Sequence, residues 1–211
     1  LAHHQNDQAE TLIHHLARGC GMRGMRGMLP VQGRVIRPFL CIDRKEIEHY
    51  LNVNQIPYHT DSSNRSDQYI RNRIRNHVVN YLQENVNSKT VEHLAETASI
   101  ASEAEAYISE QAERVRNVYV KCHRRKVQIS QEIEKEPHII RIYILMQALE
   151  QLYGQRKDIS REHLEQILGL FQKETGKRIR IHGAVDAYRD YDGISLERAK
   201  KKEKTFETLI W

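Results

Sequence analysis

The chain has 211 residues, of which 39% are hydrophobic and 29% are charged, and its formal net charge is +5. This length suits one large domain or two small ones. No apolar run approaches the roughly 18 residues of a membrane helix, so we exclude a membrane span, and no secretory signal is visible. The three cysteines, Cys20, Cys41 and Cys122, form neither a metal motif nor a disulfide framework, which favours the cytoplasm.

The stretch 1–28 combines a helix with a glycine-rich loop. The helix is predicted from about Gln8 to Gly19, because apolar residues recur every three or four positions and glycine often ends helices. These apolar residues are Ala9, Leu12, Ile13 and Leu16. Asp7 and Glu10 have the spacing of an N-cap acid and its capping-box partner. A helix N-terminus of this kind is also where open α/β sheets bind nucleotides and other anions, and the two interpretations are compatible, because one carboxylate can cap a helix and still face a site.

The same stretch resembles the second signature of the tRNA(Ile)-lysidine synthases, which are N-type ATP pyrophosphatases of the PP-loop group. The matching residues are Ala2, His3, His4, Asp7, Glu10, Thr11, Arg18, Gly19, Gly21, Gly24, Gly27 and Met28. Asn6 departs from the pattern, because many members carry a second Asp there. One carboxylate fewer is then available near a metal ion.

Residues 33–37 predict a short strand, and a capped helix follows it. Asp43 and Glu46 have capping-box spacing at the helix start. The predicted buried face comprises Ile47, Tyr50, Leu51 and Val53. Two segments are similar to those that lysidine synthases carry here, namely Arg37-Pro38-Phe39-Leu40 and Arg44-Lys45-Glu46-Ile47.

A group of arginines marks the start of the next predicted helix. Arg71 and Arg75 lie one turn apart on one face, and Arg73 points elsewhere. Guanidinium groups bind phosphate oxygens bidentately, so this face suits pyrophosphate or RNA. A solvated helix flank is the alternative, and the residues alone leave both open. The predicted buried stripe comprises Ile70, Ile74, Val78 or Val79, and Leu82.

These arginines carry a second resemblance to the same family. The closing signature of the lysidine synthase catalytic domain is matched by Asp61, Ser63, Asn64, Tyr69, Arg71, Asn72, Ile74 and Arg75. Two separate signatures in the family's order argue against a chance resemblance.

Around residues 85–89 the composition changes, which predicts a domain boundary. Apolar residues from Val91 to Val118 then recur every three or four positions, which predicts one helix of about 30 residues. The first part of this helix is acidic, and the basic residues around its end are Arg114, Arg116, Lys121, Arg124, Arg125 and Lys126. They form either a solvated end at the favourable C-terminal pole or a patch that binds the RNA backbone, and both interpretations stay open.

The remaining sequence predicts two helices and a small sheet. Pro137 suits the first turn of one helix and Ser160 the N-cap of the next. Alternating residues predict strands, and Asp192-Gly193 predicts a turn before the last of them. These strands cover residues 127–129, 176–181, 184–191 and 194–196. The charged run 200–204 suits a solvated tail.

The resemblance implies an α/β fold class. Residues 1–86 would be the C-terminal part of a PP-loop (adenine nucleotide alpha hydrolase-like) domain. Residues 87–211 would be a mainly helical α+β domain that recognises tRNA and carries a small C-terminal sheet.

The resemblance also implies an activity, which is tRNA modification by ligation. A lysidine synthase uses ATP to adenylate the C2 oxygen of the wobble cytidine in tRNA(Ile) with a CAU anticodon. The amino group of free L-lysine then displaces AMP and leaves lysidine. ATP and Mg²⁺ are the implied cofactors, tRNA is the partner, and a homodimer stays open.

Site residues follow from the matched positions. We expect His3, Asp7, Glu10 and Arg71 in the catalytic centre, with Asp7 and Glu10 on lysine and Asp7 on Mg²⁺. The nucleotide would contact His3, Arg18, Gly19, Arg71 and Arg73. The tRNA would contact Arg23, Arg26, Arg75, Arg114, Arg116, Lys121, Arg124 and Arg125. The loop 18–28 would close over the anticodon base, with its glycines as hinges.

One departure from the family is large, because the Ser-Gly-Gly-x-Asp-Ser loop that cradles pyrophosphate is absent from the sequence. The chain begins at Leu1 in what we expect to be a strand, so we predict a fragment that cannot turn over ATP alone. Two alternatives remain. A tRNA-thiolating PP-loop enzyme is disfavoured, since no Cys-x-x-Cys is present, and a non-catalytic tRNA-binding fragment would bind with strong salt dependence.

Overall fold

The structure, a computed structural model, describes residues 1–59, 67–123, 126–153, 159–181 and 185–199. The chain divides into two compact units, Leu1–Tyr107 and Ile108–Trp211. Helices accompany antiparallel sheets, so the described chain is mixed α/β. None of the described helices is long and apolar enough to cross a membrane.

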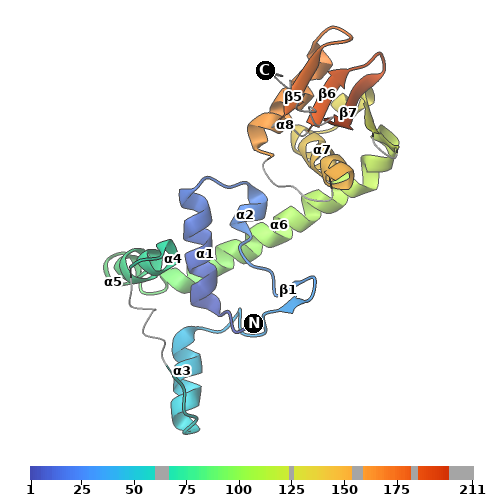
Figure 1. Ribbon diagram of the computed structural model, residues 1–211. Helices are drawn as coiled ribbons and strands as arrows, with labels where there is room; N and C mark the ends of the chain where they lie inside the picture. The colour runs from blue at the N-terminus through green and yellow to red at the C-terminus, as the bar shows by residue number, and fades with distance from the viewer. Residues whose placement is uncertain (60–66, 124–125, 154–158, 182–184, 200–211) are drawn as a thin grey trace, which may run out of the picture. The chain divides into compact units, whose positions relative to one another are not determined.

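Unit 1 is mainly helical (Figure 1). Its elements are α1 (Gln5–Ala17), α2 (Met22–Met25), β1 (Val31–Gln32), β2 (Val35–Ile36), α3 (Arg44–Val53), α4 (Ile70–Arg73), a π-helical turn (Ile74–Val79), α5 (Asn80–Asn85) and the first part of α6 (Thr90–Tyr119). The predicted long helix is confirmed as α6, which has 30 residues. The division between the units falls within it, so the boundary at 86/87 stays a prediction.

Helix α1 begins earlier than the sequence predicted. Its N-cap is His4, and Asp7 occupies the third helical position, where its Oδ2 accepts a hydrogen bond from His4 N–H at 2.9 Å. Asp7 is therefore the acidic partner of the cap and not the N-cap itself. Residues 1–4 form no strand, contrary to expectation.

The buried face of α1 is partly as predicted. Ala9 and Leu12 are buried, but Leu16 is 49% exposed. Gly19 has a φ of 74°, the left-handed conformation that favours glycine directly after a helix.

Helix α3 is capped as predicted, but its apolar face is open. Asp43 accepts a hydrogen bond from Lys45 N–H, and Glu46 accepts one from Asp43 N–H. Tyr50 and Val53 are 62% and 66% exposed, so the predicted burial of these two residues is wrong. The helical period places them on one side of α3, but a period does not supply an element to cover them.

The arginine-bearing helix contains an insertion that the sequence did not reveal. After Arg73 the backbone forms a π-helical turn, Ile74–Val79, in which hydrogen bonds join residues five apart instead of the four of an α-helix. Ile74 and Val79 are therefore the buried pair, whereas Ile70 and Val78 are 53% and 40% exposed.

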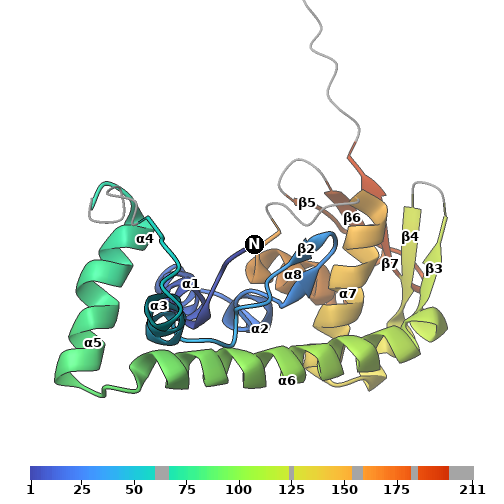
Figure 2. The same ribbon diagram turned by 90° about the horizontal axis from the view of Figure 1, so that it is seen from below.

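Unit 2 is a five-stranded antiparallel sheet with helices on one face (Figure 2). The strand order is β3-β4-β7-β6-β5. The strands are β3 (Val120–Cys122), β4 (Lys126–Ser130), β5 (Arg178–Ile181), β6 (Val185–Arg189) and β7 (Gly193–Arg198). The helices are the end of α6, α7 (His138–Tyr153), α8 (Arg161–Leu168) and two 3₁₀ turns, Gln131–Lys135 and Gly169–Gln172.

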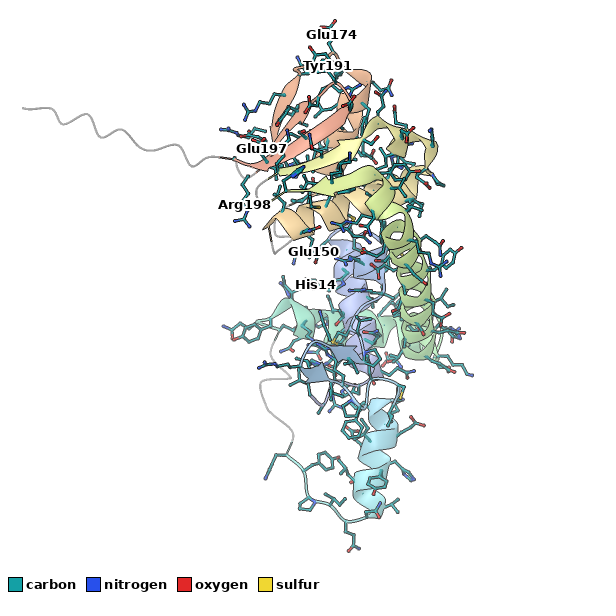
Figure 3. The ribbon with its side chains drawn as sticks, turned by 90° about the vertical axis from the view of Figure 1, so that its right-hand side faces the viewer. His14, Glu150, Glu174, Tyr191, Glu197 and Arg198 are labelled. Atoms are coloured by element: carbon teal, nitrogen blue, oxygen red, sulfur yellow. The ribbon has the colours of Figure 1, made fainter. Side chains whose placement is uncertain are left out.

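The predicted elements of this unit are largely confirmed. The hairpin pairs Arg180 with Asp186, and Ser160 caps α8 by accepting a hydrogen bond from His163 N–H. Strand β3 was not predicted, because its three residues directly continue α6. Tyr191, between β6 and β7, is 84% exposed (Figure 3). The predicted tail at 200–204 lies outside the described residues.

The core of unit 2 lies between its sheet and its helices. Alternate residues of β4 and β7 point into it, including Val127, Ile129 and Leu196, and Ile144 and Leu145 of α7 cover them. On the opposite face Asp186 accepts hydrogen bonds from Arg180 at 2.7 and 2.9 Å. These bonds, together with Arg178, lower the pKa of the Asp186 carboxyl.

Candidate functional site

Two distant stretches of unit 1 meet in a cluster of four charged residues. Asp7 and Glu10 come from the first turns of α1, and Arg71 and Arg75 come from α4 and the π-helical turn. Arg71 donates from Nε to Glu10 at 2.9 Å and from Nη2 to Asp7 at 2.7 Å. Arg75 donates from Nε to Glu10 at 2.5 Å and from Nη2 to Asp7 at 3.3 Å. The cluster joins residues more than 60 positions apart.

The four charges balance, but they differ in exposure. The side chain of Glu10 is 1% exposed and that of Asp7 10%, whereas Arg75 is 21% and Arg71 44% exposed. Hydrogen bonding to Glu10 raises the pKa of Arg75. Glu10 and Arg75 are thus the inner pair, and Asp7 and Arg71 are the outer pair. A cavity of about 280 Å³ borders the inner pair, with His4, Asn6 and Lys45 also in its lining.

His3 lies beside this cluster and is held by an arginine. Its Nδ1 accepts a hydrogen bond from Arg37 Nε at 3.1 Å, and Arg37 also donates to the Leu29 carbonyl. Burial lowers the pKa of His3, with Arg71 and Arg37 acting in the same direction and Asp7 against them. The imidazole is therefore neutral at pH 7, with its proton on Nε2.

The predicted metal ligand Asp7 does not fit a magnesium ion in this arrangement. Its Oδ1 accepts from Arg71 and Arg75, and its Oδ2 accepts from His4 N–H. Across the parts of the chain that the structure describes, no group of three acidic, histidine or cysteine residues could hold a metal. Asn6, the departure from the family pattern, accepts a hydrogen bond from Arg44 N–H at 3.0 Å and so ties the start of α3 to α1.

The glycine-rich loop is fastened at several points. Gln8 donates to the Met28 carbonyl at 3.0 Å and accepts from Met28 N–H at 2.7 Å. His15 Nδ1 lies 2.7 Å from the Gly24 carbonyl. A Cβ on Gly24 would meet Cys20 Cβ at 2.4 Å, so this glycine is a packing position rather than a hinge.

A second set of ion pairs holds the predicted tRNA-binding arginines of this loop. Arg23 donates to Glu105 Oε1 at 3.0 Å, and Arg26 donates to Glu105 Oε2 at 2.7 Å. The Glu105 side chain is only 4% exposed.

Three predicted nucleotide contacts are not brought into the four-residue cluster. Arg18 is the exposed C-cap of α1, and Gly19 follows it. Arg73 is exposed and, in the described part of the chain, forms no ion pair. Asp61, Ser63 and Asn64 of the closing signature lie outside the described residues.

Of the predicted RNA contacts of unit 2, Arg114 and Lys121 are exposed and Arg116 is half-buried. Arg114 pairs with Glu110, and Arg116 donates to Gln151 at the end of α7. Lys121 is exposed on β3. Arg124 and Arg125 lie outside the described residues.

The sequence contains a signal for Glu105 that the family signatures do not include. Glu105 continues the stripe of Ala98, Ala101 and Ala112 at helical spacing, so its position alone predicts a buried side of α6. A buried carboxylate needs a cationic partner, and the arginines of the loop provide it. Arg37 and Gln8 carried no comparable signal, because their partners are distant backbone groups and His3.

Residues 1–82 match the family model of the PP-loop domain. The chain is 31% identical over 205 residues to a tRNA(Ile)-lysidine synthase from Caldanaerobacter subterraneus subsp. tengcongensis, an alignment that covers 97% of this chain and 44% of that protein. The corresponding protein of Clostridium perfringens is 33% identical over 205 residues, or 96% of this chain and 44% of the relative.

A tRNA(Ile)-lysidine synthase of Bacillus subtilis is 48% identical over 88 residues, which are 40% of this chain and 19% of that protein. The chain thus spans less than half the length of the curated relatives that it matches.

Proposed function

We propose that this chain takes part in the reaction of the tRNA(Ile)-lysidine synthases. The proposal is supported by its similarity to these enzymes along nearly its whole length and by the match of residues 1–82 to the PP-loop domain. In this proposal the protein is a cytoplasmic ligase. It uses ATP to adenylate the C2 oxygen of the wobble cytidine of CAU-anticodon tRNA(Ile), with release of pyrophosphate. The amino group of lysine then attacks C2, and AMP leaves.

The structural observation that supports this proposal is the balanced cluster of Asp7, Glu10, Arg71 and Arg75. The reaction brings together a cationic substrate, lysine, and an anionic one, the nucleotide. Two such substrates can replace the partners of an ion pair inside the protein. The lysine ammonium then binds the carboxylate, and a nucleotide phosphate binds the guanidinium. The outer pair, Asp7 and Arg71, suits this exchange because Arg71 is 44% exposed. The inner pair keeps α1 and α4 in place.

The other residues have supporting roles in this proposal. Neutral His3, held by Arg37, would present its Nε2–H beside the nucleotide. Asp7 would meet Mg²⁺ only after release from its arginines, so we assign no step to the metal. The pyrophosphate cradle, Ser-Gly-Gly-x-Asp-Ser, is not among the 211 residues.

The first test is AMP release from ATP, with and without L-lysine and CAU-anticodon tRNA(Ile). It compares the 211-residue chain with the same chain preceded by a PP-loop segment that carries Ser-Gly-Gly-x-Asp-Ser. We expect release that needs both lysine and tRNA in the extended protein, and none from the shorter chain. Salt-sensitive tRNA binding without AMP release in either protein would favour the RNA-binding alternative.

A matched pair of variants tests the role of the cluster. In the extended protein Arg71→Gln should lower AMP release by about 100-fold, the scale of a lost charge-stabilising contact. Arg34→Gln removes the same charge from an exposed position between β1 and β2, and it should change the rate by less than about threefold. Equal effects of the two substitutions would contradict the assignment of Arg71.

A further inference from the structure

We propose that Glu105 is a positioning residue that prepares the glycine-rich loop for RNA. By holding Arg23 and Arg26 on one carboxylate, it keeps both guanidiniums ready for a phosphate of the RNA backbone. The RNA part of this inference rests on the proposed function. Glu105 lies on α6, outside the residues 1–82 that match the PP-loop domain.

The geometry is that of a shared buried anchor. Each carboxylate oxygen of Glu105 accepts from a different arginine, at 3.0 Å from Arg23 Nε and 2.7 Å from Arg26 Nη1. The carboxylate is 4% exposed, whereas the two arginine side chains are 36% and 22% exposed. The two guanidiniums are therefore fixed by the buried Glu105 carboxylate while they remain accessible to solvent.

The charge of this group favours an anion. Two guanidiniums on one carboxylate leave a net charge of +1. Within the described residues each guanidinium has only this ion pair, so further N–H donors remain to bind phosphate oxygens. Because the arginine side chains are already ordered by Glu105, less conformational entropy is lost when RNA binds.

The backbone of the loop is held by hydrogen bonds that do not involve Glu105. The role of Glu105 in holding the arginine side chains is therefore separate from the folding of the loop. Gln8 binds both backbone groups of Met28, and His15 binds the Gly24 carbonyl. Removal of the Glu105 charge should therefore release the two arginine side chains while the backbone of the loop stays attached to α1.

The test compares Glu105→Gln with Glu103→Gln in the full chain. Both remove one negative charge from α6, but Glu103 is exposed. Electrostatics alone predicts that either substitution strengthens binding of CAU-anticodon tRNA(Ile). Positioning predicts that Glu105→Gln instead weakens it by about threefold to tenfold, the effect of one lost ion contact. Tighter binding by both variants would overturn the proposal.

Two further measurements keep the result decisive. Glu105→Asp retains the charge, but the aspartate side chain is too short to hold both arginines in the same geometry, so this variant should also weaken tRNA binding. It tests the proposal even if Glu105→Gln does not fold. Trypsin cleavage after Arg23 and Arg26 requires no RNA, and it should be faster in Glu105→Gln than in Glu103→Gln. If the wild-type chain fails to bind tRNA, the proposed function fails, and the cleavage rates still decide whether Glu105 holds the loop.

Discussion

At the scale of single residues, Glu10 shows how a side chain in a functional signature can serve the fold. Its carboxylate is 1% exposed and accepts hydrogen bonds from both Arg71 and Arg75. Glu10→Gln keeps the shape of the side chain but leaves two guanidiniums with less compensating charge. We expect a loss of about 2–3 kcal/mol of unfolding free energy, less than for a fully buried pair because both arginines reach solvent.

This loss would be measured by urea unfolding, with amide hydrogen exchange in α1 as the signal. Glu84→Gln, on the exposed side of α5, is the matched control and should change stability by less than about 0.5 kcal/mol. Equal stabilities of the two variants would mean that the cluster contributes nothing to the attachment of α1 to α4.

His3 makes the stability of this region depend on pH. Burial lowers the pKa of its imidazole below the ordinary value near 6.5, so the folded state favours the neutral form. The stabilisation is thus present above about pH 6.5 and is lost as the pH falls. Protonation would also place an N–H on Nδ1 opposite the Arg37 donor. We expect hydrogen exchange around residues 1–5 to rise between pH 7 and pH 5, after correction for the intrinsic exchange rate.

A substitution separates His3 from other titrating groups. Asn at position 3 can accept from Arg37 without titrating, so His3→Asn should flatten this pH dependence. His93→Asn, at an exposed position on α6, should leave it unchanged. An identical pH response in the His3→Asn variant would show that another group causes it.

At the scale of elements, the glycine-rich loop depends on glycine for two different reasons. Gly27 has a φ of 60°, and a Cβ there would meet Gln8 Oε1 at 2.6 Å. Gly27→Ala should therefore strain the backbone by about 1–2 kcal/mol and displace Gln8 from Met28. Faster amide exchange across residues 21–28 would report the loosened loop.

Gly21 supplies the control for this experiment. Its φ is −85°, and nothing lies within 4 Å of an added Cβ. Gly21→Ala should leave exchange in the loop unchanged or slow it slightly, because alanine restricts the unfolded chain. Loosening of the loop by both substitutions would indicate that its flexibility, and not the packing at Gly27, sets the exchange rate.

Local patterns at this scale predicted element types better than element contacts. The capping residues Asp43 and Ser160 and the 30-residue α6 follow from short-range spacing, and all are confirmed. The π-helical turn at Ile74–Val79 was not predictable, because an apolar stripe with either Val78 or Val79 fits the same sequence. The choice depends on packing against α1, which the sequence of one helix does not contain.

At the scale of the whole molecule, the candidate site was predicted in its residues but not in its pairing. The two signatures named Asp7, Glu10, Arg71 and Arg75, yet the carboxylates and guanidiniums were assigned to separate ligands. Their mutual neutralisation appears only when segments more than 60 residues apart are brought together. Glu105 was missed for the same reason, since its partners lie about 80 residues away.

The two units differ in how much apolar surface they bury, and this difference predicts their order of unfolding. In the described part of unit 1 the core cluster is small, and consists of Ala9, Ile74, Val79 and Val91 with Ile13 and Leu94 beside it. Unit 2 instead buries both a sheet face and the helices that cover it. Because stability grows with buried apolar area, we expect two thermal transitions, the lower one from unit 1.

Two core substitutions assign these transitions. Leu12→Ala in α1 should lower only the first transition, and Leu145→Ala in α7 should lower only the second, each by the equivalent of about 2–5 kcal/mol. Leu12 and Leu145 are 1% and 0% exposed, so their burial is matched. Calorimetry would give the transition temperatures, and hydrogen exchange in α1 and α7 would identify the unit that melts. A single transition that both substitutions shift together would mean that α6, which belongs to both units, makes them unfold as one.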